Sequence, residues 1–290
     1  MNDFIIMTDS CCDLTAQLAD KLELTVLPLS FTINGKEHYN YLDGRDISSS
    51  HFYRLLREGT QCTTSAANTN AFLSAMEPVL KKGKDILCIC FSSALSTTCA
   101  SAQMAAKELV LKYPNNKIYI VDSLSASLGQ GMLTYYAVQQ KQNGKTIEQV
   151  YQWMEQNKLH LCHWFTVDDL NHLKRGGRIS PAVAFVGSLL GMKPILHVDD
   201  TGHLVNVGKI KGRRASLSQL VEKLEQTAVH IAEQTIFISH GDCPEDAELL
   251  ANMIRKQLPV KDIIINPIGP VIGSHSGPGT LAVFFFGTKR

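Results

Sequence analysis

The segment Ile268–Gly279 carries residue types that could bind an anion. Its sequence, I-G-P-V-I-G-S-H-S-G-P-G, places one imidazole, His275, between two hydroxyls. Glycines allow a close approach of the backbone to a ligand, and prolines restrict the chain around them, so the composition favours a stiff loop. Hydroxyls, an imidazole and backbone amides together suit a carboxylate or a phosphate. An ordinary surface turn with an incidental histidine is the alternative.

Two other segments are rich in hydroxyls. Q-C-T-T-S at 61–65 contains Thr63 and Thr64 and is predicted to be a turn between two helices; helix capping is the alternative role. F-S-S-A-L-S-T-T at 91–98 contains Ser93 and Ser96 and runs from a predicted buried strand into a helix. Its hydroxyls would lie beside the free amides of that helix. The segment has neither the lysine and glycines of a P-loop nor a G-x-S-x-G elbow.

Some of the residues could also form a hydrolase triad or a metal site. A serine, His275 and either Asp9 or Asp122 would form a hydrolase triad, but the sequence lacks the elbow pattern that usually presents the nucleophile. His160, Cys162 and His163 resemble a metal set. Strand alternation would turn His163 away from the other two, and no C-x-x-C pair is present. We expect no metal and no cofactor.

Composition excludes several classes of protein. The chain has 290 residues, 44% of them hydrophobic, with 28 basic and 27 acidic residues. This balance argues against nucleic acid as a partner, which usually requires a basic excess. No apolar run approaches the roughly 20 residues that span a bilayer, and the first residues do not resemble a signal peptide. We expect a cytoplasmic monomer with reduced cysteines.

The first half of the chain alternates between strands and helices. We expect strands at 4–7, 25–33, 85–91 and 117–121, and helices at 14–22 (capped by Asp13), 48–57, 68–80, 95–111 and 129–142. This alternation predicts an α/β fold with a mostly parallel sheet. Ligands of such sheets bind beyond the carboxyl ends of the strands, and three of the expected strands end in hydroxyl residues, at 8–10, 92–93 and 122–123.

The pattern changes near residue 160. A short helix is expected at 167–173, then K-R-G-G-R at 174–178, and then a hairpin of strands 193–198 and 203–210. Further helices and strands follow to residue 266. The sequence therefore predicts two lobes, an α/β lobe over 1–160 and an α+β lobe over 161–290.

Taken together, these motifs resemble the DegV family, bacterial fatty-acid-binding proteins that serve a separate fatty acid kinase. The resemblance covers essentially the whole chain and depends on the order of its motifs. They are T-D-S at 8–10, T-T-S at 63–65, F-S-S-A-L-S at 91–96, V-D-S at 121–123, S-L-G-Q-G at 127–131, D-L-x-x-L-K-R-G-G-R-I-S at 169–180, G-x-L-L-x-x-K-P-I-L at 187–196 and G-P-V-I-G-S-H-S-G-P-G at 269–279.

The resemblance implies a site and a partner. A long-chain fatty acid would lie between the lobes, with its carboxylate held by Thr64 and Ser96 and with Thr63, Ser93 and His275 close by. The kinase would phosphorylate this carboxylate to an acyl-phosphate, and the binding protein would be no enzyme itself. A protonated His275 would bind the anion and offset the charge that develops on it.

The resemblance also implies an apolar tunnel and a docking face. Burial contributes roughly 0.8 kcal/mol per CH₂, so a C16 chain would gain on the order of 10 kcal/mol. Arg178 and Lys211 would face the kinase, although a solvated surface is the alternative. Candidates for the tunnel lining, which could equally be core, are Phe165, Phe185, Val186, Leu189, Leu190, Met192 and Ile195.

The chain departs from the family pattern at two places beside the expected carboxylate pocket. Ala66 and Ala67 stand where the family often has glutamine and proline, and Thr97 stands where it often has glycine. A threonine has less backbone freedom than a glycine and adds bulk. We therefore expect a slightly altered pocket and leave the preferred acyl chain open.

Overall fold

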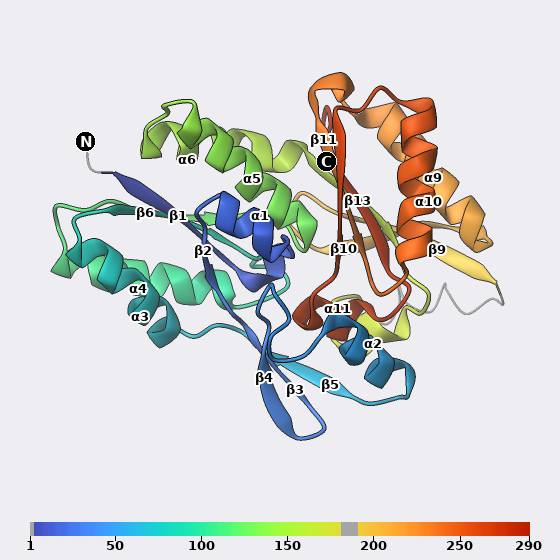
Figure 1. The fold of residues 1–290 in the computed structure, drawn as a ribbon, viewed down its shortest axis with the longest axis horizontal. Helices are drawn as coiled ribbons and strands as arrows, with labels where there is room; N and C mark the ends of the chain where they lie inside the picture. The colour runs from blue at the N-terminus through green and yellow to red at the C-terminus, as the bar shows by residue number, and fades with distance from the viewer. Residues whose placement is uncertain (1–2, 181–190) are drawn as a thin grey trace.

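A computed structural model describes residues 3–180 and 191–290. The predicted lining residues Phe185, Val186, Leu189 and Leu190 lie outside the described residues. Two β-sheets, each with helices, lie side by side, and a small third sheet lies below their junction in the view of Figure 1.

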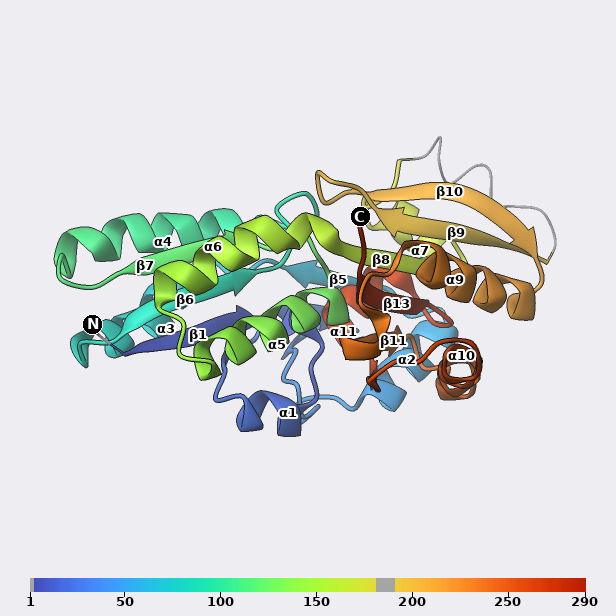
Figure 2. The same cartoon turned by 90° about the horizontal axis from the view of Figure 1, so that it is seen from above.

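The first sheet has four parallel strands in the order β2-β1-β6-β7, which confirms the predicted parallel sheet. Side chains alternate between its faces, so Ile6 and Leu87 enter one core and Met7 and Cys88 another. Helices therefore cover both faces, α5 and α6 on one and α3 and α4 on the other (Figures 1 and 2). The bounds are β1 (Phe4–Asp9), β2 (Thr25–Leu27), β6 (Asp85–Cys90), β7 (Ile118–Asp122), α3 (Thr69–Lys81), α4 (Thr98–Lys112), α5 (Leu128–Gln142) and α6 (Ile147–Asn157).

A three-stranded antiparallel sheet of order β4-β3-β5 corrects two predictions. The strand expected at 25–33 is divided at Pro28 between β2 and β3, which belong to different sheets. The hydroxyl segment at 61–65 is not a turn but an edge strand, in which Thr64 is the register partner of Phe31. Threonine favours strands because its branched Cβ suits a pleated surface. The elements are β3 (Ser30–Ile33), β4 (Lys36–Tyr39), β5 (Cys62–Ser65), η1 (Ser10–Cys12), α1 (Ala16–Lys21) and α2 (Ser49–Arg57).

The second lobe is built on a six-stranded mixed sheet of order β10-β9-β8-β13-β11-β12. Neighbouring strands are antiparallel except β11 and β12. One face packs against α9 and α10, and the other shares a core with α5, so α5 is buried between the two large sheets (Figure 2). The bounds are β8 (Leu161–Thr166), β9 (Met192–Val198), β10 (Leu204–Lys211), β11 (Thr235–His240), β12 (Asp262–Pro267), β13 (Leu281–Phe286), α7 (Asn171–Arg175), α9 (Arg213–Thr227), α10 (Pro244–Gln257), α11 (Pro270–Ser276), η2 (Lys158–His160) and η4 (Ile231–Glu233).

Several helix starts differ from prediction. The first helix is capped by Thr15, whose side chain accepts a hydrogen bond from the Leu18 amide, whereas Asp13 is buried at the end of η1. The helix expected from residue 95 begins at Thr98, because residues 92–96 form a hydrogen-bonded turn. The short helix expected at 167–173 is α7, which begins at Asn171.

The glycine-rich segment at 268–279 is mainly a helix, α11, and not a loop. Pro270 occupies its first turn, where a missing amide is tolerated, and Gly277 ends it with φ of 80°. The amides of Gly273 and Gly277 donate to backbone carbonyls within this segment. These amides are therefore not available to an anion, contrary to the expectation from the sequence.

Within residues 3–180 and 191–290, no helix is long and apolar enough to cross a membrane. The same residues contain no cluster of three or more His, Cys, Asp and Glu side chains suited to a metal ion.

Candidate functional site

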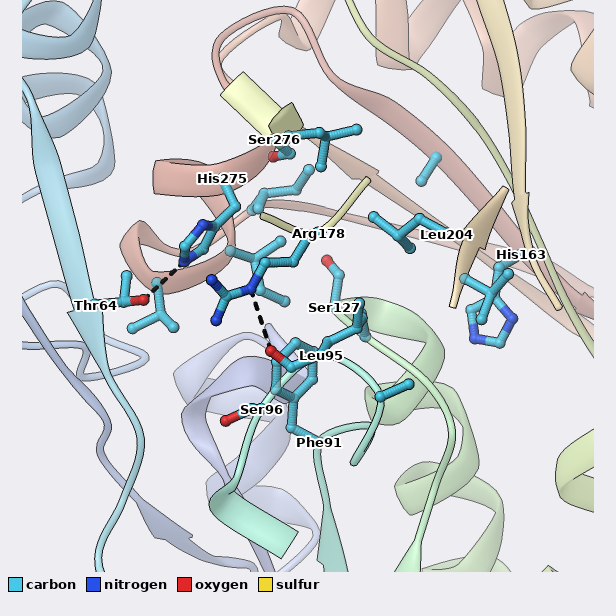
Figure 3. Close-up of a pocket in the computed structure, with 18 of the residues that line it drawn as sticks. Thr64, Phe91, Leu95, Ser96, Ser127, His163, Arg178, Leu204, His275 and Ser276 are labelled. Atoms are coloured by element: carbon cyan, nitrogen blue, oxygen red, sulfur yellow. Dashed lines mark hydrogen bonds between the residues drawn. The ribbon is translucent and has the colours of Figure 1, made fainter. Parts of the chain in front are cut away.

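A cavity of about 510 Å³ lies where the elements of the two lobes meet (Figure 3). Its walls come from β5, the turn after β6, the start of α5, the residues after α7, one face of the second large sheet, and α11. This volume lies within the range typical of small-molecule pockets. The cavity brings together the three hydroxyl-bearing segments that the sequence singled out.

At one end of the cavity, His275 and Thr64 form a hydrogen bond. The imidazole Nε2 lies 2.7 Å from the Thr64 hydroxyl oxygen, although 211 residues separate them. His275 projects from the last turn of α11, and Thr64 from the edge strand β5. The predicted pairing of these two segments in one site is therefore present in the structure.

His275 is neutral at pH 7, which corrects the expectation of a protonated imidazole. Burial, and then the positive charge of Arg178, lower its pKa to about 4. Its Nδ1 has no hydrogen-bond partner among the described residues and faces Gly176, where a Cβ would lie only 2.1 Å away. The neutral ring can both donate and accept one hydrogen bond, but it carries no charge.

Arg178 lies in the cavity wall, although the sequence placed it on a partner-facing surface. Its Nε donates to the Leu95 carbonyl at 3.2 Å, and Nη1 donates to the Gly176 carbonyl. Figure 3 shows the guanidinium between His275 and Ser96. Among the described residues that line the cavity, Arg178 alone carries a formal charge. The site is therefore suited to an anion.

Ser96 and Ser93 also line this end of the cavity. Ser96 Oγ accepts from the Thr98 amide at 3.2 Å and lies 2.9 Å from the Thr98 hydroxyl. Because the amide occupies one acceptor position of Ser96, its own hydrogen can be donated to a ligand. Ser93 is exposed at the rim, where its amide donates to Asp122 Oδ1 at 3.1 Å.

Two of the predicted polar residues lie outside the described lining of the cavity: Thr63, which was expected near the carboxylate, and Lys211, which was expected on a partner-facing surface. Thr63 is exposed on the opposite face of β5 from Thr64, as strand alternation requires, and is absent from the described lining. Lys211 is exposed at the end of β10, where it pairs in register with Met192.

The rest of the cavity is predominantly apolar. Phe165 lines it as predicted, whereas Met192 and Ile195 are not among its described lining residues. Ile195 is buried within β9. The apolar lining that the sequence did not identify includes Leu29, Phe91, Leu173, Val198, Leu204, Ile268, Val271, Ile272, Ala282 and Phe284.

Three polar lining residues, His163, Ser239 and Ser127, also escaped prediction as site residues. Ser127 caps no amide of α5, and its hydroxyl donates to Asp13 Oδ2 at 2.6 Å. The sequence did contain a signal for His163 and Ser239. His163 and Ser239 each lie in a mainly apolar buried strand, and a buried polar residue needs a hydrogen-bond partner.

Comparison with known proteins agrees with this architecture. Residues 3–288 match the family model described as "Uncharacterised protein, DegV family". The chain is 51% identical over 290 residues to a DegV domain-containing protein of Clostridium perfringens, covering 100% of this chain and 99% of that one. It is 36% identical to a DegV domain-containing protein of Streptococcus pyogenes, with 98% of each chain covered.

Solved structures show the same fold. A DegV family protein from Thermus thermophilus, described with its fatty acid binding, superposes with a TM-score of 0.89 at 28% identity, covering 98% of this chain and 99% of that one. DegV from Bacillus subtilis, described as a fatty acid binding protein, superposes with a TM-score of 0.86 at 27% identity, covering 99% and 100%. The α/β fold with its second lobe is thereby confirmed, and the chain belongs to the DegV family.

Proposed function

We propose that this protein binds a long-chain fatty acid in the cavity and presents its carboxylate to a separate kinase, which phosphorylates it to an acyl-phosphate. One observation carries the proposal. The charge of Arg178 and the hydroxyls of Thr64 and Ser96 lie at one end of a cavity that is otherwise mainly apolar. A carboxylate with a long hydrocarbon chain has the same distribution of charge and apolar surface.

The energetics favour this division of roles. Burial of the chain supplies most of the affinity, at roughly 0.8 kcal/mol per CH₂. Hydrogen bonds to a charged group add about 1.5–3 kcal/mol and set the orientation. The similarity to solved proteins described as fatty-acid-binding supports the same ligand class.

The geometry around His275 favours binding over hydrolysis. A hydrolase triad needs a carboxylate on the second imidazole nitrogen. Here that nitrogen, Nδ1, faces Gly176 and has no partner among the described residues. Nε2 contacts a threonine hydroxyl on an edge strand.

The first test is organic extraction of the purified protein, followed by mass spectrometry. We expect stoichiometric fatty acid and no esterase turnover; no bound lipid together with esterase turnover would favour a hydrolase. The second test compares T64V with T63V by titration with stearic acid. T64V should weaken binding about tenfold, whereas T63V, the same change on the opposite face of β5, should leave it unchanged.

The kinase step has its own test. The loaded protein, a fatty acid kinase catalytic subunit and Mg-ATP are combined, and hydroxylamine traps the acyl-phosphate as a hydroxamate. We expect the hydroxamate only when all components are present. Fatty acid binding without any hydroxamate would contradict the presentation role and leave the binding role standing.

A further inference from the structure

The lining of the cavity includes two residues with polar side chains that the proposed binding of a plain hydrocarbon chain does not use. His163 is 2% exposed and Ser239 is fully buried, yet both line the cavity. Ser239 Oγ has no hydrogen-bond partner among the described residues, and the His163 ring has none of good geometry, although a backbone group of Leu161 lies close enough to it to act on its pKa. Leaving buried polar atoms unpaired costs free energy, so such atoms usually have a partner.

The His163 ring lies away from the carboxylate end. In Figure 3, His163 lies on the far side of Ser127 and Leu204 from Thr64 and His275. His163 belongs to β8, whose neighbour β13 pairs it with Phe284. A ligand whose carboxylate meets Arg178 would therefore bring the middle or the distal part of its chain to this wall.

His163 and Ser239 belong to one face of the second large sheet but do not pair with each other. Ser239 is the register partner of Ala282, which is in turn the partner of Phe165. His163 lies two residues before Phe165 in β8 and therefore on the same face of the sheet. On its other side Ser239 pairs with Asn266, whose side chain donates instead to the Asp13 carbonyl. The two residues are thus separate hydrogen-bonding positions along the same wall.

Gly129 makes room for the His163 ring. A Cβ at Gly129 would come within 2.4 Å of Nε2, and the ring stands perpendicular to that of Phe284 with centroids 5.5 Å apart. Burial holds the pKa of His163 well below its usual range, so the ring is neutral. A neutral imidazole offers one donor and one acceptor, which suits a hydroxyl, and its donor alone suits an oxo group.

From this wall we infer that the preferred ligand is a fatty acid whose chain carries an oxygen-bearing substituent, a hydroxyl or an oxo group, in its middle or distal part, with His163 and Ser239 as its hydrogen-bonding partners. The inference rests on the proposed function. The inference names the class of acyl chain, which the charge and the apolar surface of the cavity do not specify by themselves.

The test compares stearic acid with 10-hydroxystearic and 12-hydroxystearic acid, with 2-hydroxystearic acid as the control for a hydroxyl beside the carboxylate. Dissociation constants are measured on the delipidated full-length protein. We expect at least one of the two mid-chain acids to bind about tenfold more tightly than stearic acid, and the 2-hydroxy acid to show no such gain. H163L or S239A should abolish the gain over stearic acid measured on the same variant, and H163Q, which keeps a donor and an acceptor, should restore part of it.

T166V is the matched control. Thr166 also has a buried, unpartnered hydroxyl on β8, but it lies on the opposite face from His163 and outside the described lining of the cavity. Its removal should leave the preference unchanged. The inference is overturned if stearic acid binds as tightly as both mid-chain acids, as it would if ordered water satisfied the wall, or if a preference survives in both H163L and S239A. Failure of every acid to bind would instead overturn the proposed function.

Discussion

The imidazole of His275 packs edge-on against the Cα of Gly176. A Cβ at that position would lie 2.1 Å from Nδ1, much closer than any real contact allows, and 3.0 Å from Cγ, which is tighter than most real contacts. Gly176 therefore permits the ring orientation that brings Nε2 to 2.7 Å from Thr64. Gly176 of the K-R-G-G-R motif and His275 of the helix α11 are thus in direct contact.

Because of this contact, we expect G176A to weaken ligand binding more than it lowers the stability of the fold. The ring must move and lose its hydrogen bond to Thr64, so binding of stearic acid should weaken about tenfold, as expected for a buried hydrogen bond and its unpaired partner. G208A is the control, because a Cβ there meets nothing within 4 Å. Equal affinities of the two variants, measured by titration, would contradict the role given to Gly176.

Arg178 should matter for lipid binding as well as for any partner. R178M removes the only formal charge of the described lining, and stearic acid should bind roughly ten- to a hundredfold more weakly, corresponding to ~1.5–3 kcal/mol. K174M, a change at an exposed lysine of the same motif, should have no effect. A variant that binds lipid normally but fails only in phosphotransfer would restore the surface role that the sequence suggested.

The same substitution should change the titration of His275. The charge of Arg178 disfavours the imidazolium and contributes to holding the pKa of His275 at about 4. In R178M this pKa should therefore rise, although burial, the larger cause, remains. NMR titration of the His275 ring, assigned with H275Q, measures the change; an unchanged or lower pKa would contradict the proximity of the two side chains.

Asp13 should make stability depend on pH. It is buried, accepts hydrogen bonds from Ser127 at 2.6 Å and the Gly269 amide at 3.0 Å, and burial raises its pKa from 3.8 to about 7. Between these pH values the folded protein holds a proton that the unfolded chain releases. The contribution of Asp13 to the free energy of unfolding therefore decreases as the pH rises, by up to about 1.4 kcal/mol per pH unit.

D13N removes this titration. His275 titrates with the opposite slope because its pKa is lowered, so the informative quantity is the difference between the variant and the unmodified protein at each pH. Urea unfolding should show this difference moving in favour of D13N by on the order of 3 kcal/mol from pH 4.5 to pH 7. D20N, a change at an exposed carboxylate, should give a curve parallel to that of the unmodified protein. A parallel curve for D13N as well would show that Asp13 titrates normally.

The length of the cavity can be reduced from β13. Ala282 is 6% exposed and lines the apolar part beside Phe165. A282F should fill that part, weakening stearic acid at least tenfold while octanoic acid binds as before, and A282V should have an intermediate effect. Chain-length profiles of the three proteins measure this, with thermal unfolding as a check for overpacking. A profile that does not shift would place the acyl chain elsewhere.

Much of the fold was decided by local sequence. The strands β1, β6 and β7 are short apolar runs, and the helix α3 follows from apolar residues at helical spacing, because both patterns reflect which face is buried. The hairpin of β9 and β10 follows from its turn residues. The hydroxyl segment at 91–98 was also identifiable, since it follows a strand of the parallel sheet, where ligands bind.

Other features depended on the tertiary structure. The segment with Thr64 became a strand because β3 offered it a partner, and alternation then separated Thr64 from Thr63. The glycine-rich segment with His275 became a helix that begins at Pro270 and ends before Gly277, because its apolar residues pack against neighbouring elements. Composition favours a loop in such a segment, and only long-range contacts override it.

The sequence by itself determined the family, the parallel sheet and the hydroxyl and imidazole groups of the site. Only the tertiary structure decided that Arg178 turns inward, that His275 is neutral and that His163 and Ser239 line the cavity. The physical reason is that burial and charge proximity arise between residues distant in the chain. The hydrogen bond between Thr64 and His275 joins residues 211 positions apart, so no local sequence pattern predicts it.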